Sequence, residues 1–260
     1  MTAVVEVLAK HLNVPQKMYN FTLPQNRQNA FEFQPEDLVV FGTPVYAGRV
    51  PNVLLNYLRT IRGSGASAVA VVTFGNRWYD DALAELTALL RNGGLRPVAA
   101  GAFAGEHAFS TVLGAGRPDS VDLRSVRCFA EEIVPVIMSQ REESSLPLVQ
   151  VGRPETQWVY YQPKDQNGVP IDIRKVKPVV WDGCIRCGVC ASVCPMGSID
   201  ADDVSRYTGI CIKCGACIKK CPQQVRDYVD PGYLYHKADL ERSFTRRAEP
   251  EWFIASPDKG

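Results

Sequence analysis

Short apolar runs recur along the first half of the chain. Residues 38–42 and 68–74 are continuous apolar runs of strand length, and 97–105 is a third strand-like run. Runs without polar alternates are typical of strands buried on both faces of a parallel sheet. Weak alternation over 17–23 predicts one further short strand.

Amphipathic segments of helical period lie around and between these runs. Apolar residues recur at spacings of three and four in segments 3–12, 53–61, 83–90 and 126–137. Strands and helices that alternate with short connections predict an α/β domain with a parallel sheet and right-handed crossovers. We assign this domain to residues 1–138.

The periodic pattern then stops. Residues 139–180 contain five prolines and no sustained period, so we expect an extended linker that lies on both domains. Residues 181–230 form a second, cysteine-rich module. We assign residues 231–260 to a C-terminal tail, with a short helix predicted over 239–247.

Composition and charge exclude several classes of protein. Hydrophobic residues make up 46% and charged residues 22%, as in soluble globular proteins, and the net charge of +1 indicates no nucleic-acid partner. No apolar run reaches the roughly 18 residues of a membrane span. Glu6 and Lys10 interrupt the first apolar residues, so a secretory signal is not expected. Cysteines crowded into one segment are typical of metal binding in a reducing cytoplasm.

Eight of the nine cysteines form a repeated motif, C-x2-C-x2-C-x3-C-P. The first copy is Cys184, Cys187, Cys190, Cys194 and Pro195, and the second is Cys211, Cys214, Cys217, Cys221 and Pro222. Thiolates at this spacing in a curled loop can face one iron–sulfur cube, and Gly188 and Gly215 leave amide N–H groups free to point at sulfur. The alternative is zinc on C-x2-C pairs. A zinc ribbon has no use for the third cysteine or the proline, so the repeat favours two [4Fe–4S] clusters.

Segment 181–230 resembles two-cluster bacterial ferredoxins, in which the fourth cysteine of each motif binds the other cluster. The resemblance implies one cluster on Cys184, Cys187, Cys190 and Cys221, and a second on Cys211, Cys214, Cys217 and Cys194. Lysines surround the second motif. Lys213, Lys219 and Lys220 form either a solvated face or a docking patch for an acidic redox partner protein.

Two loops of the α/β domain, 42–51 and 74–81, carry aromatic, glycine and hydrogen-bonding residues where predicted strands end. Ligands of open α/β sheets bind at such ends. With 101–107, these loops resemble the flavodoxin-like domain of bacterial flavodoxin–ferredoxin fusion proteins, and the whole resemblance covers nearly the entire chain. It implies FMN, with Tyr46 at the ring and backbone groups of Thr43, Gly75 and Asn76 at its polar rim. The full set of implied FMN contacts is Thr43, Pro44, Val45, Tyr46, Gly75, Asn76, Arg77, Tyr79 and Asp80.

The start of the chain departs from the flavodoxin pattern. A flavodoxin domain begins with a strand and a T/S-x-T-G-x-T loop that holds the FMN phosphate at a helix N-terminus. Here Met1-Thr2 leads directly into the predicted helix. The missing strand would be an interior one in the strand order 2-1-3-4-5. A start placed too late, a truncated sequence, and a domain that lost FMN and repacked would each explain this.

The leading hypothesis is an electron-transfer protein that carries single electrons through two clusters and exchanges those electrons with FMN. The alternative is a ferredoxin-type shuttle or binding subunit whose α/β domain lost FMN and serves as a docking scaffold. A substrate-specific reductase ranks last, because His107 is its one candidate group and a hydrogen-bonded structural histidine is the simpler interpretation. An electron carrier is therefore favoured over a substrate-specific oxidoreductase. We expect Cys128 to be a buried structural thiol and Asp80-Asp81 to cap a helix.

Overall fold

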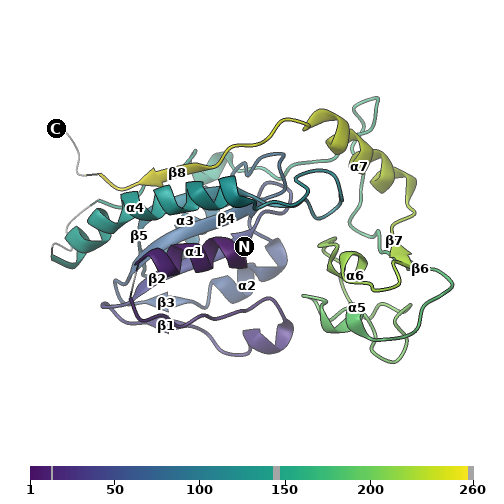
Figure 1. Cartoon of the computed structure of the whole chain (residues 1–260), viewed down its shortest axis with the longest axis horizontal. Helices are drawn as coiled ribbons and strands as arrows, with labels where there is room; N and C mark the ends of the chain where they lie inside the picture. Colours follow the sequence, from purple (N-terminus) through teal and green to yellow (C-terminus); the bar gives the residue numbers. More distant parts are fainter. Residues whose placement is uncertain (13, 143–146, 257–260) are drawn as a thin grey trace.

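Figure 1 shows the computed structural model of the chain, which describes residues 1–12, 14–142 and 147–256. Its centre is a four-stranded sheet in the order β2-β4-β5-β8. Strands β2, β4 and β5 are parallel, and β8 is antiparallel to β5. The bounds are β2 (Leu38–Pro44), β4 (Ser67–Phe74), β5 (Arg96–Ala104) and β8 (Glu251–Ile254). The three predicted parallel strands are present, but the sheet as a whole is mixed.

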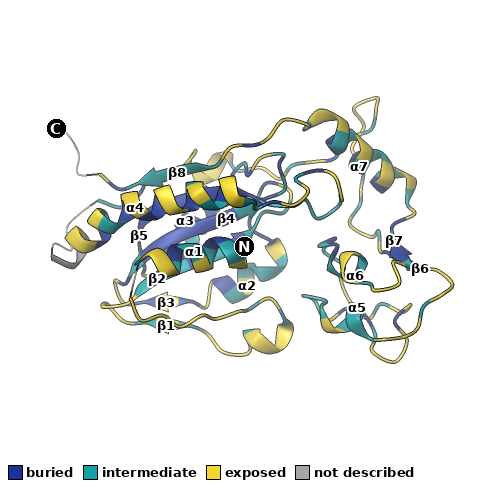
Figure 2. Ribbon diagram, in the orientation of Figure 1, coloured by how far each residue is buried: buried dark blue, intermediate teal, exposed yellow. Residues whose placement is uncertain are grey.

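Helices cover both faces of the sheet (Figure 1), and Figure 2 shows the strands buried between them. One face packs against α3 (Ala82–Asn92), which contributes three buried leucines to the core. The other face packs against α1 (Thr2–Leu12) and α4 (Ser120–Glu142). Successive side chains of β4 point to opposite faces of the sheet. Val71 packs in the core with α1 and α4, whereas Val72 packs in the core with α3. This burial on both faces explains why the strands are continuous apolar runs.

The predicted strand over 17–23 does not form. Phe21 instead packs its ring on Phe41 of β2, with the ring centroids 5.3 Å apart. Two other short strands pair with each other, β1 (Glu32–Phe33) and β3 (Arg62–Gly63). Strand β2 therefore lies at one edge of the four-stranded sheet.

The end of the described chain returns to the α/β domain instead of forming a free tail. The helix α7 (Pro231–Ser243) is followed by β8, which pairs with β5 through Gly101 and Trp252 among others. Between them, the Asn76 side chain donates to the carbonyls of Phe244 and Arg246, 2.8 Å from each, and accepts from the amide of Ala248. Positions 257–260 of the predicted tail lie outside the described residues.

The described part of the predicted linker, 147–180, crosses both halves of the molecule. Val149 donates to the carbonyl of Pro97 in β5, and Arg153 forms an ion pair with Asp81. Asp81 makes no side-chain hydrogen bond as the cap of α3, so the predicted capping role is replaced by this ion pair. Positions 143–146 of the linker lie outside the described residues.

The cysteine-rich module is built from short elements. Strands β6 (Val179–Val180) and β7 (Arg226–Asp227) pair antiparallel beside the single-turn helices α5 (Val189–Ser192) and α6 (Ala216–Lys219). The remaining short elements of the chain are η1 (Pro24–Arg27), η2 (Asn52–Leu54), α2 (Leu55–Leu58) and η3 (Glu155–Gln157). None of the helices in the described ranges is long and apolar enough to cross a membrane.

Candidate iron–sulfur site

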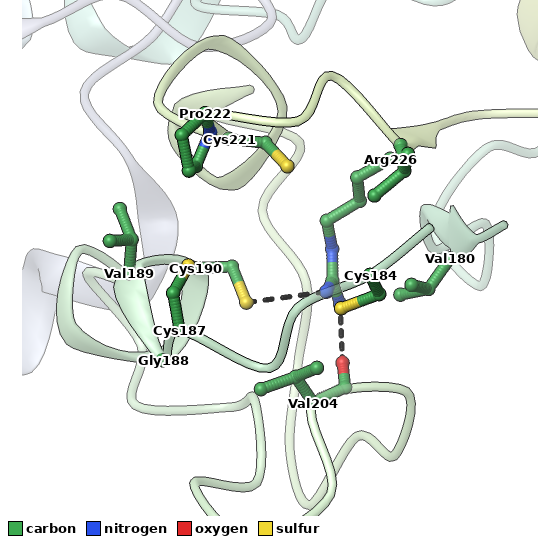
Figure 3. Close-up of a pocket in the computed structure, with 11 residues that line it drawn as sticks. Val180, Cys184, Cys187, Gly188, Val189, Cys190, Val204, Cys221, Pro222 and Arg226 are labelled. Carbon is green, nitrogen blue, oxygen red and sulfur yellow. Dashed lines mark hydrogen bonds between the residues drawn. The ribbon is translucent and has the colours of Figure 1, made fainter. Parts of the chain in front are cut away.

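The eight cysteines of the repeat surround two cavities. The first cavity, drawn in Figure 3, is lined by Cys184, Cys187, Cys190 and Cys221. The second is lined by Cys194, Cys211, Cys214 and Cys217. Each cavity thus takes three cysteines from one motif and the fourth from the other motif. The hollows are of similar size, about 310 and 340 Å³ with their open mouths included.

Each motif curls its three leading cysteines around a cavity through left-handed backbone. Arg186 and Gly188 have φ of 52° and 74° in the first copy, and Lys213 and Gly215 have 57° and 69° in the second. Gly188 and Gly215 each precede a single-turn helix that carries the third cysteine. A glycine adopts this conformation without the steric cost that other residues incur. The near-identical backbones explain why the two copies are so similar in sequence.

The thiols of the second cavity need a compensating charge. Burial raises the pKa of the Cys217 thiol to about 12 and also raises the pKa of Cys214. Thiolates in such a place are stable when iron supplies positive charge, so cluster binding releases protons. The sulfurs also receive hydrogen bonds, since the amide of Ser198 donates to Cys194 Sγ over 3.4 Å. Eight thiolate donors in two sets of four fit two [4Fe–4S] clusters.

The second cavity lies against the α/β domain. The Lys219 ammonium forms an ion pair with Glu106, at 2.5 Å, and donates to the carbonyl of His107, at 2.6 Å. A side chain at Gly215 would come closer than 3.0 Å to the carbonyl oxygen of Ala108. On the other side, Arg27 donates to the carbonyl of Pro195, the residue after Cys194.

The first cavity is the outward one. Its ligand Cys187 is exposed, whereas the ligands of the second cavity are half-buried or buried. Trp181 and Ile185 beside it are also exposed, by 48% and 61%. The second cavity also has an exposed lining residue, Ile210, at 62%. The two sites therefore differ in the exposure of their ligands and in the contacts of the second site with the α/β domain.

The three lysines of the predicted docking patch have different surroundings. Lys213 is buried, and its ammonium donates to the carbonyls of Arg174 and Cys211. Lys219 meets an acidic group of the same chain, Glu106, and Lys220 is exposed. Docking of an external acidic partner at these lysines stays a prediction.

The residues with implied flavin contacts lie at the carboxyl edge of the sheet. The Thr43 hydroxyl, near the end of β2, is fully buried and has no hydrogen-bond partner among the residues that the structure describes. Tyr46 is half-buried as a residue, yet burial and the nearby thiols of Cys214 and Cys211 raise the pKa of its phenol. Pro44 ends β2, and Val45 donates to the carbonyl of Thr73. Thr43 and Tyr46 could therefore face a ligand.

The side chains of the second loop are taken up within the chain. Asn76 holds the segment 244–248 as described above, and Arg77 pairs with Asp80. The Tyr79 hydroxyl donates to Glu251 at the start of β8. Gly75 leaves room for the ring of His107, which a side chain at this position would strike. Of the implied flavin contacts in this loop, the side chains of Asn76, Arg77, Tyr79 and Asp80 thus have partners within the chain, and the backbone groups are left for a ligand.

Other predictions had mixed outcomes. His107 is a hydrogen-bonded residue as predicted, since its Nδ1 accepts from the amide of Phe109 at 3.1 Å. Cys128 is exposed on α4, so its prediction as a buried thiol is wrong. Cys128 lies on the face of α4 opposite the buried residues Val126 and Ile133. The sequence reasoning missed Arg226, whose guanidinium donates to Cys190 Sγ over 3.4 Å. No local pattern distinguishes this arginine from the solvated ones.

Residues 183–225 match the family model of the 4Fe-4S dicluster domain. The chain thus carries a 4Fe–4S dicluster ferredoxin domain behind an N-terminal α/β domain. That domain holds two [4Fe–4S] clusters, with its eight cysteines between 184 and 221, so zinc is set aside. Its function is electron transfer. No curated protein matches the chain, and the family match does not extend over the α/β domain.

Proposed function

We propose that this chain moves single electrons between FMN held at the carboxyl edge of its α/β sheet and an external redox protein. The observation that carries the proposal is the placement of the second cavity. It lies against the sheet edge where an open α/β domain binds its ligand. An electron carrier whose inner metal site faces such an edge is suited to exchange electrons within one chain.

The chain fits FMN best along residues 43–46. A buried hydroxyl without a partner, as at Thr43 Oγ1, is costly unless a ligand satisfies it. Tyr46 follows Thr43 by three residues, and its phenol lies close enough to Cys214 and Cys211 of the second cavity for their thiols to raise its pKa. FMN, when bound, supplies chemistry that accepts electrons in pairs and releases them singly. The residues around it would orient the ring and exclude water from its cluster-facing side.

The first cavity is the proposed contact with an external redox protein. Its exposed ligand Cys187 and the exposed side chains of Trp181 and Ile185 lie on the surface of the dicluster domain. Aromatic and apolar residues of this kind are enriched at protein contacts. We therefore assign the outward site to partner exchange and the inner site to exchange within the chain.

One observation favours a second candidate function. The side chains of Asn76, Arg77, Tyr79 and Asp80 all have partners within the chain. If the α/β domain holds no flavin, these contacts make it a rigid scaffold that supports the dicluster domain. The protein would then be a ferredoxin-type shuttle or a subunit of a larger redox complex.

Anaerobic purification with measurement of iron, sulfide and flavin separates the two candidates. The proposal predicts eight irons and one flavin per chain, and flavin loss in Thr43→Val without loss of iron. Thr87→Val is the matched control, because Thr87 is also buried but bonds within α3. Eight irons with no flavin would leave the scaffold candidate.

A further inference from the structure

Arg226 places a buried positive charge at the wall of the first cavity. Only 3% of its surface is exposed. Its Nη1 donates to Cys190 Sγ over 3.4 Å, and its Nη2 donates to the carbonyl of Val204 and the hydroxyl of Tyr207, at 2.9 and 3.0 Å. Figure 3 shows the guanidinium reaching into the cavity between Cys190 and Val204. The arginine is held in place by groups on two separate segments, α5 and the loop 204–207.

This charge has no carboxylate partner. Within the described ranges, no Asp or Glu oxygen lies within 4.0 Å of Arg226. Its Nε is also buried without a hydrogen-bond partner. A buried charge is costly unless an opposite charge and hydrogen bonds compensate it. The negative charge at hand is that of the thiolates that bind iron around the cavity, one of which is Cys190.

The second cavity is different. Among the described residues, no cationic N–H group donates to its sulfurs. The amide of Ser198 donates to Cys194, and the hydroxyl of Tyr228 lies 3.8 Å from Cys211 Sγ, where either group can be the donor. Arg226 acts on Cys217 through its charge, without a hydrogen bond. Lys213 is buried nearby, but its ammonium donates to two backbone carbonyls and not to sulfur. A cationic N–H···S bond is therefore a feature of the outward site.

We propose that Arg226 raises the reduction potential of the first, outward cluster. Hydrogen bonds and charge at the ligand sulfurs are among the factors that set such potentials. Arg226 stabilises the additional negative charge that one-electron reduction brings to this site, and it does so directly at a ligand sulfur. The proposal rests on the electron-transfer function of the dicluster domain and does not depend on the flavin. Its consequence is that an electron entering the chain resides more at the site facing the external partner.

The test is a redox titration of the anaerobic full-length chain, monitored by electron paramagnetic resonance. Arg226→Gln is expected to lower one of the two cluster potentials by at least 59 mV, a tenfold change for a one-electron couple. The other potential should move less, because Arg226 reaches Cys217 of the second site through its charge and not through a hydrogen bond. Arg226→Lys keeps the charge but loses the planar fork, so a smaller downward shift of the same potential is expected. Arg186→Gln is the matched control, because this exposed arginine lies in the same motif and the charge change is the same.

The iron content of each variant is measured first, so that loss of a cluster is not mistaken for a shift. If Arg226→Gln holds fewer than eight irons, the cluster potentials of Arg226→Lys test the proposal instead. A lowered single potential in it supports the proposal, and unchanged potentials overturn it. Equal shifts of both potentials, or an equal shift in Arg186→Gln, would also overturn the proposal. Because dithionite can supply the electrons, the titration gives its answer with or without flavin. Absence of flavin would therefore defeat the proposed FMN exchange and leave this inference standing.

Discussion

Replacement of Gly215 by alanine tests whether the inner metal site is docked on the α/β domain. Gly215 has φ of 69°, and a methyl group there would come closer than 3.0 Å to the backbone oxygen of Ala108. Because that neighbour is backbone, it cannot rotate away. The two segments would have to separate by about 1 Å to restore ordinary contact.

Gly188 supplies the matched control. It occupies the same position in the first motif with φ of 74°, and nothing lies within 4 Å of the position a methyl group would take. Alanine in this conformation costs about 1 kcal/mol at either site. The docking contacts of Lys219 with Glu106 and His107 add about 1–2 kcal/mol, which only Gly215→Ala would lose.

Hydrogen exchange of the loop 105–110 gives the readout. A loss of 1–2 kcal/mol in docking corresponds to roughly 5- to 30-fold faster exchange of protected amides in this loop. We expect this acceleration in Gly215→Ala and not in Gly188→Ala, at equal iron content. If both variants exchange like the wild type, or both change equally, the docking interpretation is refuted.

Three further predictions follow from single residues. Asn76→Ala leaves carbonyls and an amide of segment 244–248 unpaired, so the free energy of unfolding should fall by about 2–4 kcal/mol in urea titrations; an effect under about 0.5 kcal/mol would contradict this role. Cys221→Ser should remove iron from the site built by the first motif, whereas damage confined to the second motif's site would contradict crossed ligation. Burial, helped by the neighbouring charges of His236 and Lys219, lowers the pKa of His107 to about 4 from 6.5. Between these values the unfolded chain binds a proton that the folded chain does not, so stability should fall with falling pH by at most about 3 kcal/mol. His107→Gln should lack this part of the pH dependence; an unchanged dependence would show that another group causes it.

The sequence predicts those features of the molecule that depend on residues close together in the chain. Buried parallel strands need continuous apolar runs. The runs at 38–42 and 68–74 lie within β2 and β4, and the run at 97–105 matches β5 up to residue 104. The iron–sulfur motif is local in the same sense, because three of four ligands of each cavity come from seven consecutive residues.

The remaining features depend on contacts between distant segments. Strand β8 was not predicted, because Glu251–Ile254 pairs with β5 about 150 residues earlier and has no alternating pattern of its own. The role of the Asn76 side chain, which holds the returning C-terminal segment, has no signal in its own loop, and flavin contact by its backbone stays a prediction. Arg226 carries no signal in its neighbours, because its role arises only when β7 lies beside Cys190. Each case is a tertiary contact that residue type and period cannot reveal.

We propose that electrons pass within one chain between the α/β domain and the inner metal site. The most direct test is flash photoreduction of flavin in the anaerobic holoprotein, followed by the absorbance change of the clusters. We expect a cluster-reduction rate that does not change with protein concentration and that slows in Gly215→Ala but not in Gly188→Ala. A rate that rises in proportion to protein concentration would show exchange between molecules and contradict the account.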